Sequence, residues 1–192
     1  LSTLRWLEGS VEQAGEHAKI ETTSPLVPVV LEPNRSGKAM SDLLADGEID
    51  AILGSRRPES LGRHPDVIRL FPDYRPIERD FYERTHIHPI MHVVAIRHDV
   101  YEKEPWIAQS LYRAFDESKN WALDRLRISA AQHCMLPFMF ADLDEVDELF
   151  DGDPWPYGVE PNRPTLEALV RHLAEQNFIR EPAPIESLFV GV

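Results

Sequence analysis

The stretch VPVVLEPNRSGKAMSDLLADGEIDAIL, residues 27–53, decides how the rest of the chain is interpreted. Its first part, Val27 to Leu31, is rich in β-branched residues, and EPN after it is typical of a turn. Ser36 can cap a helix from about 37 to 45 that ends at Gly47, and the apolar run 49–53 follows. A strand, a helix and a second strand in this order predict a βαβ unit, so we expect an α/β fold with a parallel strand pair.

Composition limits the classes of function. The chain has 192 residues, with 33 acidic and 20 basic side chains and a net charge of −13. Without a basic patch, a nucleic-acid partner is not expected. No apolar run approaches the roughly 20 residues that cross a bilayer, so no membrane partner is expected either. The single cysteine, Cys134, fits a reducing compartment, and the first residue, Leu1, suggests that the chain begins inside a longer protein.

Helical spacing of apolar residues dominates the sequence after the βαβ unit. A helix from about 74 to 84 is expected to turn Ile77, Phe81 and Tyr82 inward. The segment IMHVVAIR, residues 90–97, is the most strand-like in the chain. We expect further helices at 106–127, 130–150 and 164–177, an ordered loop at 151–163, and a terminal strand or packing tail at 185–189.

Three histidines stand close together in THIHPIMH, residues 85–92. On an extended strand His86, His88 and His92 could share a face, which is a geometry that a divalent metal could use. Pro89 interrupts any strand ladder and no carboxylate is fixed beside them, so surface histidines without a metal are the stronger reading. His92 alone, in the middle of the apolar run, is a candidate proton donor, although a buried core histidine would look the same.

Two arginines follow the second apolar run of the βαβ unit. In open α/β sheets ligands bind beyond the carboxyl ends of strands, where Arg56 or Arg57 could hold a carboxylate. Tyr74 and Arg75 stand at the start of a predicted helix, another favourable place for an anion. For each of these residues a solvated loop charge or a capped helix entry explains the pattern equally well.

The stretch WPYGVEPNR, residues 155–163, is the most unusual in the chain. Aromatic rings held by prolines suit stacking on a planar ligand, so Trp155 and Tyr157 are candidate binding residues, and Glu160 or Asn162 could bind hydroxyl groups. The same residues could instead close a core and lead into the next helix. Cys134 is expected to be a buried small hydrophobic residue in a helix. The sequence has no phosphate-binding glycine loop, no nucleophile elbow and no Cys-x-x-Cys pair.

Several blocks, taken in order, resemble the 4,5-dihydroxyphthalate decarboxylase family. They are LLADGEIDA (43–51), LFPDYR (70–75), PIMH (89–92), VY (100–101) with PWIAQSL (105–111), and WPYGVEPNR (155–163). The resemblance implies a two-lobed fold like the type 2 periplasmic binding proteins, incomplete at its N-terminus here. It implies that residues 1–91 form most of lobe two and that 92–192 return to lobe one. The family pattern has glycine and phenylalanine where His86 and His88 stand.

The resemblance also implies a function: removal of one carboxylate from 4,5-dihydroxyphthalate, giving protocatechuate and carbon dioxide in an interlobe cleft. It makes His92 the expected proton donor, Arg56 or Arg75 a carboxylate anchor, Tyr74 or Tyr157 a ring contact, and Glu160 an acceptor for a catechol hydroxyl. No cofactor is expected, the small aromatic carboxylate is the expected partner, and the location is cytoplasmic; a homo-oligomer is compatible with this reading.

Two alternatives stay open at this point. The same two-lobed fold serves solute-binding components of transporters, which would clamp a small aromatic carboxylate in the periplasm without chemistry. The second alternative is a metal-dependent aromatic-acid enzyme that binds its metal with His86, His88 and His92. Such an enzyme would lose activity with a chelator.

Overall fold

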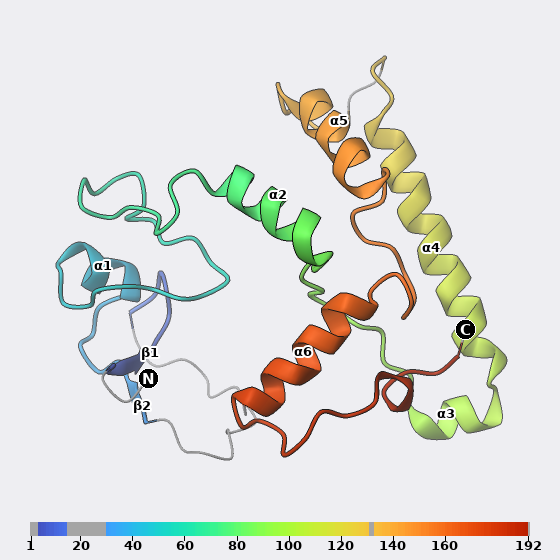
Figure 1. The fold of residues 1–192 in the computed structure, drawn as a ribbon. Helices are drawn as coiled ribbons and strands as arrows, with labels where there is room; N and C mark the ends of the chain where they lie inside the picture. The colour runs from blue at the N-terminus through green and yellow to red at the C-terminus, as the bar shows by residue number, and fades with distance from the viewer. Residues whose placement is uncertain (1–3, 15–29, 131–132, 192) are drawn as a thin grey trace. The chain divides into compact units, whose positions relative to one another are not determined.

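The computed structural model describes residues 4–14, 30–130 and 133–191 and divides the chain into two compact units. Unit 1 comprises Leu1–Tyr74 with Gln176–Arg180, and unit 2 comprises Arg75–Glu175 with Glu181–Val192. The described helices and strands appear in Figure 1 in chain order. The assignment of 1–91 and 92–192 to two lobes stays a prediction.

Unit 1 contains a parallel strand pair, but not the pair that the βαβ pattern predicts. Strand β1 (Trp6–Glu8) pairs with β2 (Leu31–Pro33), with Trp6 opposite Leu31. The second predicted strand, at 49–53, is turn and coil. Most of the first one, residues 27–29, lies outside the described residues. The run at 49–53 reads like a strand locally, yet a strand needs a neighbour for its backbone hydrogen bonds, and β2 is paired with β1 instead.

Helix α1 (Met40–Ala45) carries the core of unit 1. Its side chains Met40 and Leu43 are buried, and Leu43 is 2% exposed. The helix is shorter than expected, because Ala39 rather than Ser36 occupies the N-cap position. Gly47 ends it as predicted, with a φ of 72°, in the left-handed region that glycine adopts without a steric cost.

Unit 2 is built from helices, several of which match the sequence prediction closely. Helix α2 (Tyr74–Thr85) and helix α4 (Trp106–Leu126) lie within a residue of their predicted bounds, and Pro105 precedes the first turn of α4. A short helix, α3 (His98–Lys103), was not predicted. Helix α6 (Arg163–Glu175) confirms the last predicted helix. Its buried residues include Leu166 and Val170, which are one turn apart on the same side of the helix, and Ala168 on another side.

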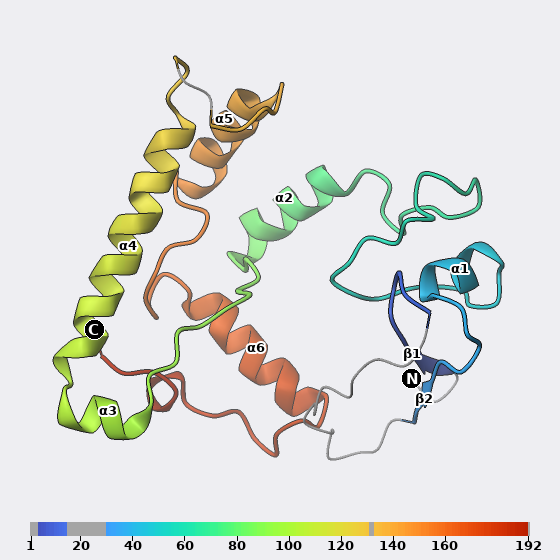
Figure 2. The same ribbon diagram turned by 180° about the vertical axis from the view of Figure 1, so that it is seen from behind.

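The predicted strand at 90–97 does not form. Figure 2 shows the segment between α2 and α3 without a strand, and the residues from 86 to 97 have no regular structure. Val93 and Val94 are more than 60% exposed, so the β-branched residues do not form a buried sheet. No neighbouring strand lies beside them in the described part of unit 2, and β-propensity alone cannot satisfy a backbone without such a partner.

The apolar side chains of α2 do not all turn inward as expected. Ile77 and Phe81 are 50% and 42% exposed, and of the three predicted residues only Tyr82 is half-buried.

The helix predicted at 130–150 is shorter than expected and is present only as α5 (Met139–Phe150). Pro137 lies just before its start. A proline inside a helix removes a backbone hydrogen bond and clashes with the preceding turn, so a helix that ran through position 137 would be broken there. Cys134 therefore lies before the helix, and it is half-buried rather than buried.

The C-terminal residues form a packing tail rather than a strand. The 3-10 helix η1 (Ile185–Ser187) buries Ile185, which is 5% exposed. Of the helices in the described ranges, not one combines the length and the apolar character needed to cross a membrane.

Candidate functional site

The loop between α5 and α6, residues 151–162, holds the largest group of predicted site residues in unit 2; we call it the aromatic loop. Asp151 ends α5 in the left-handed conformation with a φ of 53°, and Gly152 follows with a φ of 80°. A Cβ at Gly152 would lie 3.2 Å from the carboxylate of Asp147. The chain therefore leaves α5 by a sharp turn that a larger residue at position 152 would strain.

Asn162 closes the second half of the aromatic loop. Its amide Nδ2 donates to the carbonyl of Pro156 at 2.6 Å and to that of Gly158 at 2.8 Å. Gly158 has a φ of 103°, which permits the turn between these two carbonyls. Both amide hydrogens of Asn162 are thus used inside the loop, so its predicted contact with a substrate hydroxyl could use only its oxygen.

Helix α4 and Arg127, the residue that follows it, bind the carbonyl groups of the aromatic loop with three polar side chains. Tyr112 donates to the carbonyl of residue 157 at 3.3 Å, Lys119 to that of residue 155 at 3.4 Å, and Arg127 to that of residue 152 at 3.3 Å. Figures 1 and 2 both show α5 beside the C-terminal part of α4, where Arg127 also pairs with Asp147. The loop is therefore held along its length and not only at its ends.

Lys119 has the most complete set of contacts in this group. Its side chain is 10% exposed, and its ammonium pairs with Asp153 and with Asp116, the latter at 3.2 Å. Burial lowers the pKa of Lys119, but the hydrogen bonds to Asp153 and Asp116 outweigh it and leave the pKa above its ordinary value. The ammonium also lies 4.8 Å from the centroid of the Tyr157 ring, within the range of a cation–π contact.

A cluster of aromatic rings adjoins the aromatic loop. The His88 ring lies 5.0 Å from that of Phe150 and 6.2 Å from that of Trp155, measured between centroids. Thr165, which is buried, accepts from the backbone N–H of His88 and donates to its carbonyl, both at 3.1 Å. Burial lowers the pKa of His88, and Glu78 partly opposes this effect. Burial thus disfavours the protonated form of the imidazole.

The two rings of the aromatic loop remain accessible to a ligand. Trp155 is 57% exposed and Tyr157 is 37% exposed, although Pro154 beside them is buried. Glu160 is exposed, and its hydrogen bond to Arg163 at 2.6 Å lowers the pKa of its carboxyl. An ionised carboxylate in the same loop as two exposed aromatic rings can accept hydrogen bonds from the hydroxyl groups of a ligand.

The histidine segment does not adopt the geometry that a three-histidine metal site requires. His86 follows α2 with a φ of 52°, so His86, His88 and His92 do not alternate along an extended strand. In the described ranges no three histidine, cysteine, aspartate or glutamate side chains gather where they could hold a metal ion. His92 is exposed and lies outside the aromatic cluster that contains His88. Its role as proton donor stays a prediction.

Arg75 and Tyr74 differ from the sequence prediction in their contacts. Arg75 pairs with Asp142 at 2.7 Å and with Glu145, so helices α2 and α5 are joined by its guanidinium. Arg79, one turn later, pairs with Glu148 at 2.6 Å. The Tyr74 ring, in unit 1, receives the guanidinium of Arg69 at 4.8 Å. A substrate carboxylate would have to compete with two carboxylates already bound to Arg75.

Unit 1 contains Arg56 and Arg57 and a separate polar pocket. Arg56 is exposed and makes no ion pair with any described residue, whereas Arg57 donates to the carbonyl of Leu61 at 3.1 Å. The pocket, about 290 Å³ in volume, lies beside α1. Its lining includes one arginine and three carboxylates, and neither Arg56 nor Arg57 is part of it: Glu12, Ser41, Asp42, Glu59, Ser60 and Arg63, with Ala39.

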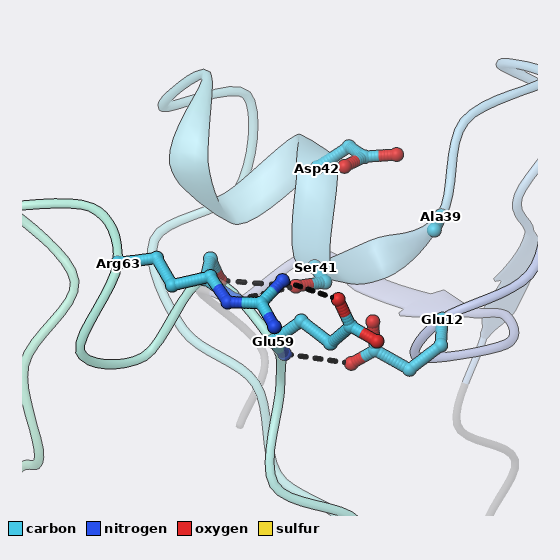
Figure 3. Close-up of a pocket in the computed structure, with 7 residues that line it drawn as sticks. Glu12, Ala39, Ser41, Asp42, Glu59 and Arg63 are labelled. Atoms are coloured by element: carbon cyan, nitrogen blue, oxygen red, sulfur yellow. Dashed lines mark hydrogen bonds and ion pairs between the residues drawn. The ribbon is translucent and has the colours of Figure 1, made fainter.

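Figure 3 shows the hydrogen bonds and the ion pair between residues of this pocket; Asp42 takes part in none of those drawn. Glu59 pairs with Arg63 at 2.6 Å, and Glu12 accepts from the backbone N–H of residue 59 at 2.8 Å. Ser41, which is buried, accepts from the backbone N–H of Ser60 at 3.0 Å. With carboxylates in excess and its one guanidinium paired, the pocket is electrostatically unsuited to a dianionic ligand.

Sequence reasoning missed the residues that hold the aromatic loop. Tyr112 and Lys119 are seven residues apart on a helix that was predicted correctly, so their shared face could have been inferred. A lysine aligned with a tyrosine along a helix is nevertheless common on solvated faces. Only the fold shows that the loop from 151 to 162 lies against that face.

No family model matches the chain. The chain is similar to a 4,5-dihydroxyphthalate decarboxylase of Comamonas testosteroni, with 36% identity over 188 residues, which is 96% of this chain and 56% of that protein. It is also similar to a 4,5-dihydroxyphthalate decarboxylase of Pseudomonas putida, with 33% identity over 82 residues, 42% of this chain and 31% of that protein. The chain thus spans about half the length of the first relative.

Proposed function

Because the chain belongs to the 4,5-dihydroxyphthalate decarboxylase family over the 188 residues of that match, we propose that the full protein removes one carboxylate from 4,5-dihydroxyphthalate as carbon dioxide. The observation that supports this proposal is the extent of the match, which covers 96% of the chain and includes the aromatic loop. The expected product is protocatechuate.

The reaction breaks the bond between a ring carbon and a carboxylate, and a proton takes the place of the carboxylate on that carbon. One molecule of carbon dioxide leaves, and no electrons are gained or lost, so the proposal requires no redox cofactor. The leaving carboxylate must be desolvated, and the carboxylate that stays must be held by cations. The charge that develops on the ring is stabilised through its hydroxyl groups.

The aromatic loop offers the contacts that a catechol ring requires. Trp155 and Tyr157 present partly exposed rings on a backbone that α4 holds in place. Offset stacking on such rings contributes about 0.5–1.5 kcal/mol per aromatic pair beyond the burial of area. Glu160, kept ionised by Arg163, is the proposed acceptor for a catechol hydroxyl.

His92 is the proposed donor of the ring proton. It belongs to unit 2, as the aromatic loop does, and its exposed side chain is open to a ligand. Imidazole is the side chain best suited to deliver a proton near neutral pH. His88 is a poorer donor at that pH because its burial disfavours the protonated form.

The carboxylate that stays on the ring needs a cation that is not already neutralised. Arg75 contacts two carboxylates of α5, so we assign it to the α2–α5 contact rather than to the substrate. Arg56, with no ion pair among the described residues, is the better candidate, and a guanidinium can hold a carboxylate by two parallel hydrogen bonds. Arg57 is a weaker one, since it donates to a neighbouring carbonyl. The two-lobed, cofactor-independent architecture is part of the same proposal.

The test follows carbon dioxide release and protocatechuate formation by the full protein with 4,5-dihydroxyphthalate. Phthalate, which lacks both hydroxyl groups, is the matched control substrate: it should bind but lose carbon dioxide far more slowly. Addition of a chelator should leave the rate unchanged. Saturable binding of 4,5-dihydroxyphthalate without any turnover would favour a solute-binding protein instead.

A further inference from the structure

We propose that Lys119 is a positioning residue for the substrate: it holds the aromatic loop from α4 so that the rings of Trp155 and Tyr157 are preset to receive an aromatic dicarboxylate. This inference rests on the proposed function, because it assumes that the aromatic loop binds the substrate ring. Lys119 itself does not touch the substrate in this account.

The ammonium group of Lys119 is fully used within the protein. An ammonium has three N–H donors, and the structure supplies three acceptors: Asp153, Asp116 at 3.2 Å and the carbonyl of residue 155 at 3.4 Å. The two carboxylates also neutralise its charge. Lys119 therefore has neither a free N–H donor nor an uncompensated charge for a dianionic substrate, unlike Arg56, the proposed carboxylate anchor.

The contacts of Lys119 fall on the part of the aromatic loop that Asn162 does not hold. Asn162 bonds the carbonyls of Pro156 and Gly158, whereas Lys119 bonds the residues on either side of buried Pro154. This section of backbone carries the Trp155 ring. Without Lys119 it would keep the hydrogen bond from the backbone N–H of Trp155 to Asp153 at 3.1 Å and the ring contact with His88, but no side chain of α4 would hold it.

Lys119 also orients the second ring. Its ammonium lies over one face of Tyr157, and Tyr112 fixes the backbone carbonyl of the same residue. A ring held by a cation on one face loses less conformational freedom when a ligand stacks against it. Tyr157 is still 37% exposed, so part of its surface remains available to a ligand.

The test is a double-mutant cycle on the full protein with 4,5-dihydroxyphthalate. Lys119→Met should raise KM by about 10-fold or more through misplacement of the rings, while kcat falls less. Lys119→Arg, which keeps the charge and hydrogen-bond donors, should restore much of the loss. Lys103→Met, a change at an exposed lysine of α3, is the matched control and should leave both constants unchanged.

The second half of the cycle repeats Lys119→Met in a protein that lacks both rings because it carries Trp155→Ala and Tyr157→Ala. There Lys119→Met should have little further effect on KM, because the groups that Lys119 positions are gone. If Lys119→Met raises KM by the same factor in this background, Lys119 does not act through the rings and the inference is wrong. If Lys119→Met does not fold, Asp153→Asn removes the same ion pair and should raise KM in the same way; an unchanged KM would overturn the inference.

Binding measurements separate this inference from the proposed function. Calorimetric Kd values for phthalate should follow the same cycle whether or not the protein releases carbon dioxide. A wild-type protein that binds phthalate but releases no carbon dioxide from 4,5-dihydroxyphthalate contradicts the decarboxylase proposal, and the Kd values for phthalate then decide the Lys119 inference. A wild-type protein that binds neither phthalate nor 4,5-dihydroxyphthalate contradicts both.

Discussion

The ammonium of Lys119 in α4 lies 4.8 Å from the centroid of the Tyr157 ring, in the loop between α5 and α6. The same ammonium pairs with Asp153 and donates to the carbonyl of residue 155, so one cation, whose side chain is 10% exposed, contacts the backbone or the ring of both aromatic residues of the loop. The exposed rings are thus presented by an ordered backbone. Preorganisation of this kind reduces the entropy that a binding site loses when its ligand arrives.

Gly158 should not tolerate a side chain. Its φ of 103° lies where residues with a Cβ are strained, so Gly158→Ala should lower the free energy of unfolding by about 1–3 kcal/mol. Gly54→Ala is the matched control, because no atom lies within 4 Å of a Cβ there and its φ is not in the strained range. Urea denaturation of the two variants checks this; equal stabilities would show that the turn at position 158 is not strained.

Arg75 should contribute to the α2–α5 contact and not to substrate binding. Arg75→Gln should lower Tm at low ionic strength, and the difference should shrink near 1 M salt, where the Debye length is only about 3 Å. KM should change little. The control is Arg84→Gln, which removes an ion pair within α2 only. A large rise in KM with an unchanged Tm would instead return Arg75 to the substrate site.

His88 should make stability depend on pH in one direction. Its pKa is lowered in the folded protein, so the unfolded chain binds more protons, and stability falls as pH drops below the ordinary value of 6.5. His88→Phe keeps an aromatic ring in the cluster and removes the titration. Relative to this variant, the wild type should lose stability between pH 7 and the lowered pKa.

Denaturation of wild type and His88→Phe across this range tests the expectation. His98→Phe is the control, because the His98 side chain is 85% exposed. A constant difference between the wild type and His88→Phe from pH 7.5 to 5 would contradict the assigned burial of His88.

His92 should be needed for chemistry more than for binding. General acid–base groups contribute about 10²–10⁴-fold, so His92→Gln should lower kcat by about 100-fold or more and leave KM near its wild-type value. Steady-state rates of protocatechuate formation give both constants. A near wild-type kcat would remove His92 from the mechanism.

Helices α2, α4 and α6 and the ordered loop could be predicted from local sequence because their signals are local, whereas α3 was missed and α5 is shorter than the predicted helix. Apolar spacing and Pro105 locate α4, and glycine and proline locate the loop at 151–163. The strands could not be predicted in this way. The β-branched run at 90–97 stays irregular and β2 pairs with β1, since strand formation depends on a partner elsewhere in the chain.

Some residues of the candidate site could likewise be predicted from local sequence, and others could not. Trp155, Tyr157 and Glu160 could be singled out from their unusual composition. Lys119 could not, because its function depends on which segment lies against α4. From the sequence, Arg75 is a candidate anion-binding residue at the start of a helix. Only the fold shows that its guanidinium is already paired with two carboxylates of α5.

The most direct test of the account is the reaction of the full protein with 4,5-dihydroxyphthalate in deuterium oxide. Protonation of the ring carbon predicts one carbon dioxide per protocatechuate formed, with a single deuterium on the ring carbon that carried the lost carboxylate. Mass spectrometry and NMR of the product measure both. Saturable binding of 4,5-dihydroxyphthalate with no carbon dioxide and no protocatechuate would contradict the account.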